Sequence, residues 1–283
     1  MSLLQLVVVA VLQGAAEVLP ISPSGHAAVA RLWQIRADGG PAIDAGLLVA
    51  TAAAVGVATR RRLGIALGEG VRAIARPRLF QASPGARDAA VLLIASAASL
   101  GTSRLVAPRV EGLRDAPIAV GLGLLAAGVG LASTVFARRG WRGARAAVGA
   151  LPREAPSIPL AALVGIAHGL AVFPGASRVG AALTVLLWLG VRADRAVDLA
   201  LLITVPSLLV AAARAIASAP THGGVARDAL AIGVVISFVA AQLAASALRG
   251  LAARRRLPAL ALWIIPLGLA LLAYARALPG SGS

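Results

Sequence analysis

The sequence predicts an all-α integral membrane protein, built as an inverted-topology repeat of helices. Hydrophobic residues make up 59% of the 283 residues, and the mean hydropathy of +0.88 is far above that of a soluble domain. Several apolar runs approach the roughly 20 residues that a helix needs to span a bilayer. The basic residues cluster between these runs, as they do in the cytoplasmic loops of multi-pass proteins.

Ten apolar helical segments follow one another along the chain. They lie near residues 3–19, 25–34, 42–59, 88–107, 117–137, 158–173, 179–191, 196–216, 228–249 and 258–276. Three connecting loops carry the Arg clusters, with seven Arg in 60–87, five in 138–157 and four in 249–256. Because positively charged loops stay in the cytoplasm, these three loops fix the orientation of the spans.

Two pairs of short segments do not fit as full spans. With this orientation, residues 158–191 must start and end in the cytoplasm, and residues 1–34 must start and end outside. Each stretch contains Pro and Gly that break a helix, at 174–175 and within 20–25, so each is predicted to be a re-entrant helical hairpin. The alternative is that each Pro only kinks an ordinary span.

The chain is therefore predicted to be a single membrane domain, 1–283, with about ten helices and six full spans. Repeat one covers 1–137, a cytoplasmic linker covers 138–157, and repeat two covers 158–283 in the opposite orientation. Inverted repeats of this kind bring discontinuous helices together near the bilayer midplane. The two breaks are thus expected to face each other across one site.

Composition argues against several other classes of protein. All 27 basic residues are Arg, and the nine aromatic residues do not alternate with them, so a nucleic-acid surface is not expected. The absence of Cys excludes disulfides and thiolate chemistry. No basic residue precedes Arg31, so the N-terminal apolar run lacks the charged start of a signal peptide and is assigned to the membrane.

The first break gathers polar groups inside an apolar region. Gln13 and Glu17 stand four residues apart, on one helix face. Ionisable groups at membrane depth mark a functional site by default, so Glu17 is predicted to be a metal ligand or a general base. The alternative is a carboxyl that stays protonated in an apolar interior.

His26 is the second reactive group of this break. It lies close to Ser22, Ser24 and Gly25 at the start of a new half-helix, where an imidazole can act as nucleophile or general acid. That half-helix directs free N–H groups at the break, which suits an anion. An ordinary hydrogen-bonded histidine is the alternative.

The second break, 174–180, supplies a cation. Arg178 is the one Arg placed within the predicted membrane core, and its planar guanidinium suits a phosphate. Ser177 is expected to N-cap a half-helix that starts near Arg178. An internal ion pair to Glu17 is the alternative for Arg178. The further candidate ligands of an anion are Gln13, Ser24, Gly25, Gly175, Gly180 and Thr184.

At these residues the chain resembles the undecaprenyl-diphosphate phosphatase family, the bacitracin-resistance membrane phosphatases. The shared motifs are Gln-x-x-x-Glu continuing into Leu-Pro-x-Ser-x-x-Gly-His at 13–26, and Pro-Gly-x-Ser-Arg-x-Gly at 174–180. The resemblance implies two re-entrant hairpins with six spans. It also implies hydrolysis of undecaprenyl diphosphate to the monophosphate, which recycles the lipid carrier of cell-wall synthesis. The site would open to the outer face of the bacterial plasma membrane.

The resemblance also implies roles for individual residues. Glu17 would be linked to a divalent cation, Mg²⁺ or Ca²⁺, or would act as a base, and His26 would be catalytic. Ser22, Ser177 and Arg178 would hold the diphosphate. Three positions depart from the family pattern, since a hydroxyl residue is usual at Pro23 and at Val179, and a polar amide is common at Leu48. Loss of single donors costs about 10²–10³ in rate, so reduced or altered activity is compatible with the sequence.

Two other functions fit the pattern of residues. A transporter or flippase for polyprenyl phosphate, or a lipid-binding relative without activity, would also use inverted repeats with a midplane site. An ion or drug exporter with Glu17 as proton relay fits less well, because Arg178 and the helix N-termini favour an anion. A homodimer is compatible with the sequence, and membrane lipids are expected partners.

Overall fold

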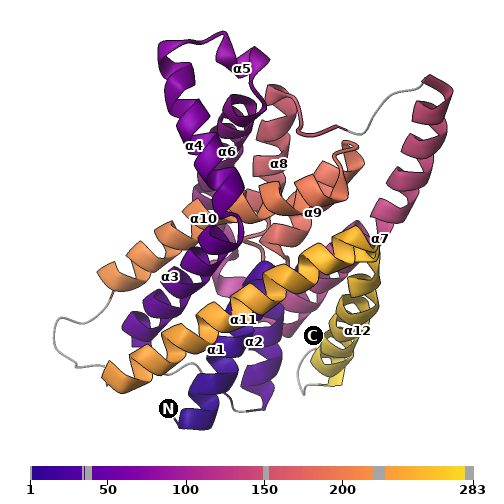
Figure 1. The fold of residues 1–283 in the computed structure, drawn as a ribbon. Helices are drawn as coiled ribbons and strands as arrows, with labels where there is room; N and C mark the ends of the chain where they lie inside the picture. Colours follow the sequence, from indigo (N-terminus) through magenta and orange to yellow (C-terminus); the bar gives the residue numbers. More distant parts are fainter. Residues whose placement is uncertain (1, 34, 36–39, 149–152, 219–226, 278–283) are drawn as a thin grey trace.

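The structure is a computed structural model that describes residues 2–33, 35, 40–148, 153–218 and 227–277. The described residues form twelve α-helices (Figure 1), namely α1 Leu3–Val18, α2 Pro23–Leu32, α3 Gly40–Ala58, α4 Arg60–Ala75, α5 Leu79–Ala82, α6 Pro84–Val110, α7 Pro117–Val148, α8 Ile158–Leu170, α9 Arg178–Trp188, α10 Ala193–Ala217, α11 Arg227–Ala253 and α12 Ala261–Ala277. Two short 3₁₀ helices, Glu111–Leu113 and Leu257–Leu260, extend α6 and precede α12.

Six helices are long and apolar enough to cross a membrane, which confirms the predicted all-α membrane protein with six spans. They are α3, α6, α7, α10, α11 and α12. The helices α1, α8 and α9 are apolar but too short for this, as expected of segments that break at 19–22 and 171–177. The inverted symmetry and the re-entrant course of these short helices stay predictions.

Two predicted loops are partly helical, which corrects the sequence-based boundaries. The stretch 60–87 was expected to be a loop, but it forms α4 and α5. The reason is a small apolar face, since Ala66 and Ala73 lie seven residues apart and are buried where α4 packs on α6. In the expected linker 138–157, α7 continues to Val148, and residues 149–152 lie outside the described part of the chain.

The short helices pack closely on spans from the other half of the chain. Helix α1 lies along α11, and α8 lies along α6. Small residues permit this approach, because a Cβ on Gly14 would lie 2.2 Å from the Ser237 carbonyl oxygen, and one on Gly165 would lie 2.1 Å from that of Ala95. The two halves therefore exchange equivalent contacts, α1 with α11 and α8 with α6, in a way that accords with the predicted repeat.

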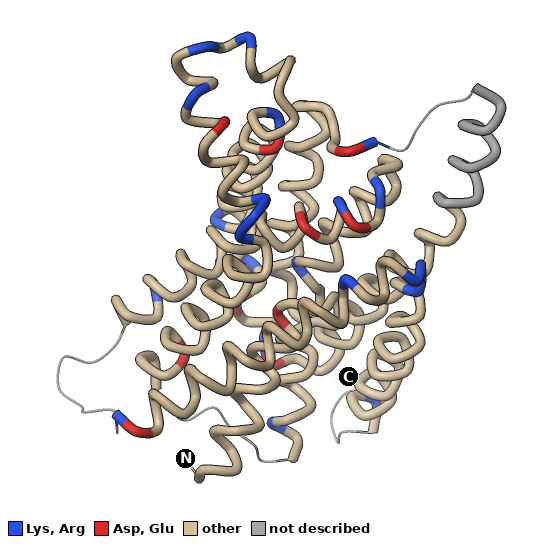
Figure 2. Tube along the Cα trace, viewed as in Figure 1, with Lys and Arg blue, Asp and Glu red and all other residues tan. Residues whose placement is uncertain are grey.

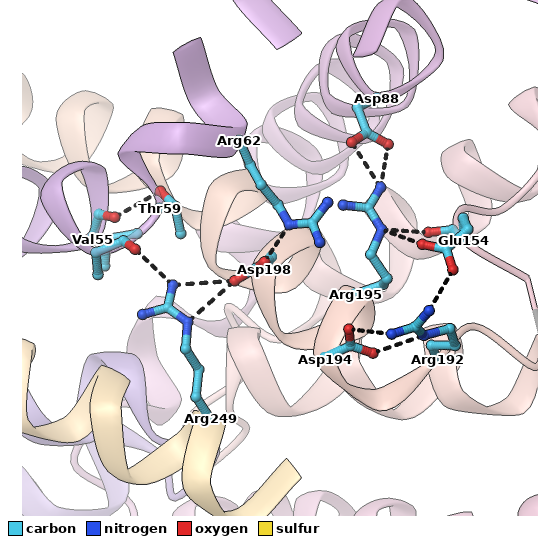
Figure 3. A network of polar contacts seen from close by, with 11 residues as sticks. Val55, Thr59, Arg62, Asp88, Glu154, Arg192, Asp194, Arg195, Asp198 and Arg249 are labelled. Atoms are coloured by element: carbon cyan, nitrogen blue, oxygen red, sulfur yellow. Dashed lines mark hydrogen bonds and ion pairs between the residues drawn. The ribbon is translucent and has the colours of Figure 1, made fainter. Parts of the chain in front are cut away.

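An ion-pair network joins α4, α6, α10 and α11 close to the N-terminal ends of α6 and α10 (Figures 2 and 3). Arg195 is 3% exposed, and its Nη2 donates to both carboxylate oxygens of Asp88 at 2.7 Å. Asp198 accepts from Arg62 at 2.5 Å and from Arg249 at 3.1 Å. These pairs could not be predicted from the sequence, because the partners are 51 to 136 residues apart.

Candidate active site

The two helix breaks meet in space. The backbone N–H of Gly175, in the second break, donates to Ser24 Oγ of the first at 2.9 Å. Gly175 has a φ of +82°, and a Cβ there would lie 1.9 Å from the Val120 carbonyl oxygen, so only glycine fits this turn. The second break is thus packed against α7 at Gly175, and the first break is hydrogen-bonded to the same residue. The expectation that the two breaks form one site agrees with this contact.

Glu17 and Arg178 join the two breaks electrostatically. Arg178 Nη1 lies 3.8 Å from Glu17 Oε1, an ion pair that is too long for a hydrogen bond. The Glu17 side chain is 7% exposed and the Arg178 side chain 30% exposed, so the guanidinium retains an open side. The ion pair that was the alternative for Arg178 is therefore present, and it leaves the cation accessible to a ligand.

Both half-helices begin with a serine cap. Ser177 Oγ accepts from the Gly180 N–H at 3.1 Å at the start of α9, which confirms the predicted cap. Ser22 Oγ accepts from the Gly25 N–H at 3.1 Å at the start of α2, and it lies 3.3 Å from Ser24 Oγ. Both serines are buried, so each hydroxyl is turned toward its helix N-terminus. In the first turn of α2, Pro23 has no N–H and those of Gly25 and His26 are already bonded, so only the Ser24 N–H is left for an anion. The first turn of α9 leaves the N–H groups of Arg178 and Val179.

Ser22 also has an unusual backbone conformation. Its φ is +71°, in a region that non-glycine residues seldom occupy and that costs of order 1–3 kcal/mol. The strain is held by three contacts, since the Ser22 carbonyl oxygen accepts from His26 while its hydroxyl bonds Gly25 and Ser24. This local conformation fixes the direction in which α2 leaves the break.

His26 is held at both ring nitrogens. Nδ1 lies 2.9 Å from the Ser22 carbonyl oxygen, and Trp263 Nε1 of α12 donates to Nε2 at 3.0 Å. A carbonyl only accepts and an indole N–H only donates, so Nδ1 carries the proton and Nε2 carries the lone pair. The two rings are inclined by 20° with centroids 6.3 Å apart, so they lie edge to edge along this hydrogen bond. In the described part of the chain these are the polar partners of His26, and sequence analysis missed Trp263 because it lies 237 residues away.

A cavity of about 320 Å³ opens beside the first break. Gln13 lines it together with Pro23 and Leu48, two of the positions that depart from the family pattern. Its wall is therefore mostly apolar at the points where the family has polar groups. The third departure, Val179, is 1% exposed and belongs to the hydrophobic core. Its missing hydroxyl would thus not face this cavity.

Other polar or glycine residues near the breaks are buried where helices pack together. A Cβ on Gly25 would lie 2.7 Å from Leu124, so the glycine permits close packing of α2 on α7. Thr184 is buried within α9. His168 is fully buried, with Ser99 Oγ 2.7 Å from Nδ1 and Thr204 Oγ1 3.0 Å from Nε2. It joins α8 to α6 and α10.

Arg178 also lines a second cavity of about 770 Å³, between the C-terminal ends of α6 and α10. Arg104 and Arg214 contribute to the same wall. The sequence analysis did not single them out, because both lie near helix ends where charge was read as a mark of topology. A signal was present, however, since the predicted orientation places both at the outer side, where the positive-inside bias does not explain them.

The donor set bears on the expected divalent cation. No group of three or more acidic or His side chains gathers in the described ranges, so no protein cage for a metal is seen there. Glu17 is the carboxylate where the breaks meet. Mg²⁺ is commonly held by one or two carboxylates together with substrate phosphates and water. The site therefore fits a cation that is shared with a phosphate ligand.

Comparison with known proteins gives a consistent result. Residues 6–270 match the family described as bacitracin resistance protein BacA. The chain is 31% identical to an undecaprenyl-diphosphatase of Maricaulis maris, over 97% of this chain and 99% of the relative. It is 32% identical to an undecaprenyl-diphosphatase of Dinoroseobacter shibae over 86% and 88%, and 29% identical to one of Treponema denticola over 97% and 98%.

Proposed function

The chain belongs to the bacitracin resistance protein BacA family, and we propose that it is a membrane phosphatase that hydrolyses a polyprenyl diphosphate to the monophosphate and inorganic phosphate. The relatives named above are undecaprenyl-diphosphatases, which gives the substrate class. The observation that carries the proposal is the contact between the two helix breaks, which places an accessible guanidinium and two helix N-termini together. Its product would return the lipid carrier to cell-wall synthesis.

The diphosphate is bound by Arg178 and by the first turns of α2 and α9. A guanidinium can donate two parallel hydrogen bonds to a phosphate, and such charge-assisted bonds are stronger than the existing 3.8 Å contact with Glu17. Helix N-termini add N–H donors and a favourable dipole. Ser24 and the backbone of Gly175 hold the two breaks at the separation that this binding requires.

Hydrolysis breaks the anhydride bond between the two phosphates. Water adds to the terminal phosphorus, the lipid monophosphate leaves with the electron pair, and a base takes the proton of the water. Nε2 of His26 is the base or nucleophile in this scheme, since Nδ1–H is committed to Ser22 and Nε2 carries the lone pair. The Trp263 bond to Nε2 must open first.

Glu17 is the residue that would hold a divalent cation, Mg²⁺ or Ca²⁺, together with the substrate phosphates. Such a cation supplies positive charge that offsets the charge of the diphosphate. Arg178, which lies 3.8 Å from Glu17 without a hydrogen bond to it, would turn toward the phosphates. The protein acts in the bacterial plasma membrane, with the site open to the outer face.

Phosphate release by the purified protein tests this function. The substrates are polyprenyl diphosphates of several chain lengths, assayed with and without a chelator. We expect release that the chelator abolishes, with about 10²–10³-fold loss in His26→Ala and in Arg178→Ala, because each removes a group that acts on the transition state. Arg109→Ala is the control, since Arg109 bonds the backbone of its own helix at an exposed position. Unchanged turnover in both His26→Ala and Arg178→Ala would contradict the mechanism.

A further inference from the structure

The cavity between the C-terminal ends of α6 and α10 continues outward from Arg178. It measures about 770 Å³, within the range of cavities that enclose small ligands. Its charged wall consists of Arg104, Arg114, Arg178 and Arg214, with Glu111 as the acidic residue. Because Arg178 contacts Glu17 on one side and lines this cavity on the other, the cavity adjoins the candidate active site.

Of these four guanidiniums, two have a carboxylate nearby and two have no ion-pair partner in the described ranges. Arg114 lies 3.9 Å from Glu111, and Arg178 lies 3.8 Å from Glu17. Arg104 and Arg214 form no ion pair with any residue in the described ranges. Near the N-terminal ends of α6 and α10, by contrast, Arg62, Arg195 and Arg249 all have carboxylate partners (Figure 3). The cavity therefore has an excess of positive charge.

Helix stability explains only part of this charge. Arg214 lies in the last turn of α10, where a cation stabilises the helix dipole. Arg104 lies more than a turn before the end of α6, whose last-turn cation is Arg109. The dipole thus accounts for Arg109 and Arg214, but not for Arg104 or for its place in the same wall as Arg178 and Arg214.

We propose that Arg104 and Arg214 form a phosphate-binding site that receives the inorganic phosphate released beside Arg178 and leads it to the outer side. The proposal rests on the proposed hydrolysis for its source of phosphate. A free phosphate dianion is the anion that this reaction produces, and exposed guanidiniums attract it without burying it. Stepwise transfer from Arg178 to Arg104 and Arg214 would draw the product away from the reacting centre.

Direct binding of inorganic phosphate tests the proposal apart from hydrolysis. Calorimetry on the purified full chain in detergent, without lipid substrate, compares Arg104→Gln, Arg214→Gln and the double variant. Each single change should weaken binding about three- to tenfold, as expected for partly solvated charge-assisted bonds, and the double change should weaken it further. Arg104→Lys should retain part of the affinity because it keeps the charge.

Arg109→Gln is the matched control. It removes the same charge from an exposed position on the same helix, and Arg109 is not among the residues that line the cavity. Its phosphate affinity should equal that of the unchanged protein. Arg109→Gln and Arg214→Gln should lower the unfolding temperature equally and only slightly, because each removes one exposed last-turn cation, which stabilises its helix only weakly. If both cavity variants bind phosphate as tightly as Arg109→Gln, or if the unchanged protein binds none, the proposal is wrong.

Nanodiscs separate a free phosphate from a lipid headgroup. Phosphate affinity should be the same in phosphatidylcholine and in phosphatidylglycerol nanodiscs. Loss of binding in phosphatidylglycerol alone would assign the cavity to an anionic headgroup and overturn the proposal. If the unchanged protein binds phosphate but does not hydrolyse a polyprenyl diphosphate, the proposed function is wrong and the phosphate site stands.

Discussion

At the scale of single residues, the two ring contacts of His26 bear on the proton transfer proposed above. Its Nδ1–H is fixed by the Ser22 carbonyl, and that carbonyl is in turn held by the strained turn at Ser22. Its Nε2 lone pair is occupied by the Trp263 indole. The first contact sets the tautomer that the chemistry needs, whereas the second must open before Nε2 can act.

Substitutions at Trp263 separate these two contributions. Trp263→Phe keeps an aromatic ring beside His26 but removes the N–H, so kcat should stay unchanged or rise. Trp263→Ala also removes the ring that orients His26, and because aromatic pairs contribute about 0.5–1.5 kcal/mol, kcat should fall about two- to tenfold. Steady-state phosphate release measures both. An equal loss in the two variants would contradict the view that the indole N–H holds the resting state.

Sequence alone predicted the local parts of the site and missed the distant ones. The Ser177 cap was predictable, because Ser before a half-helix binds an N–H only three residues away. The Glu17–Arg178 pair was foreseen as an alternative, since both are charges in an apolar region. Trp263, Arg104 and Arg214 were not foreseen, because only the packing of α12, α6 and α10 brings them to the site.

At the scale of helices, hydropathy and length determined what could be predicted. The six spans are long apolar segments that have no other stable environment, so their existence followed directly from sequence. Helix α4 was missed because its Arg residues resemble a cytoplasmic loop, while the buried face that stabilises it is made of Ala66 and Ala73. Alanine gives a weak hydrophobic signal even where it packs tightly.

The ion pair between α6 and α10 should be important for stability. Asp88→Asn leaves the Arg195 guanidinium buried with less compensation, and loss of one partner of a buried pair costs about 3–5 kcal/mol. We therefore expect a clearly lower free energy of unfolding, measured by denaturant titration in detergent micelles. Glu154, which is exposed and also contacts Arg195, will reduce the loss somewhat.

The matched control for this pair is the exposed ion pair of Arg192 and Asp194. The two side chains are 49% and 52% exposed, and exposed pairs contribute about 0–1 kcal/mol. Asp194→Asn should therefore change stability little. Equal stability of the Asp88 and Asp194 variants would show that the network in Figure 3 does not hold the helices together.

At the scale of the whole molecule, the predicted orientation in the membrane can be tested by cysteine labelling. The chain has no Cys, so single cysteines can be introduced without background. With a membrane-impermeant maleimide on intact cells, Gly112→Cys should react, because the predicted orientation places the residues after α6 at the outer side. Arg78→Cys, between α4 and α5, should react only after permeabilisation. The reverse pattern would invert the topology and remove the outward site.

The two halves of the chain also bear on transport, the alternative function. Equivalent contacts of α1 with α11 and of α8 with α6 accord with a repeat, but a repeat alone does not separate a phosphatase from a flippase. A transbilayer assay with polyprenyl phosphate, beside the hydrolysis assay, does so. Lipid movement without phosphate release would favour the transporter.

The central claim is that the two helix breaks build one phosphate-handling site, and a double-mutant cycle on Glu17 and Arg178 tests it most directly. The measurement is kcat/KM for phosphate release in Glu17→Gln, Arg178→Ala and the double variant. If the residues act in one site, each single variant loses about 10²–10³-fold and the double variant loses little more than the worse single. Losses that multiply in the double variant would show independent roles and contradict a shared site.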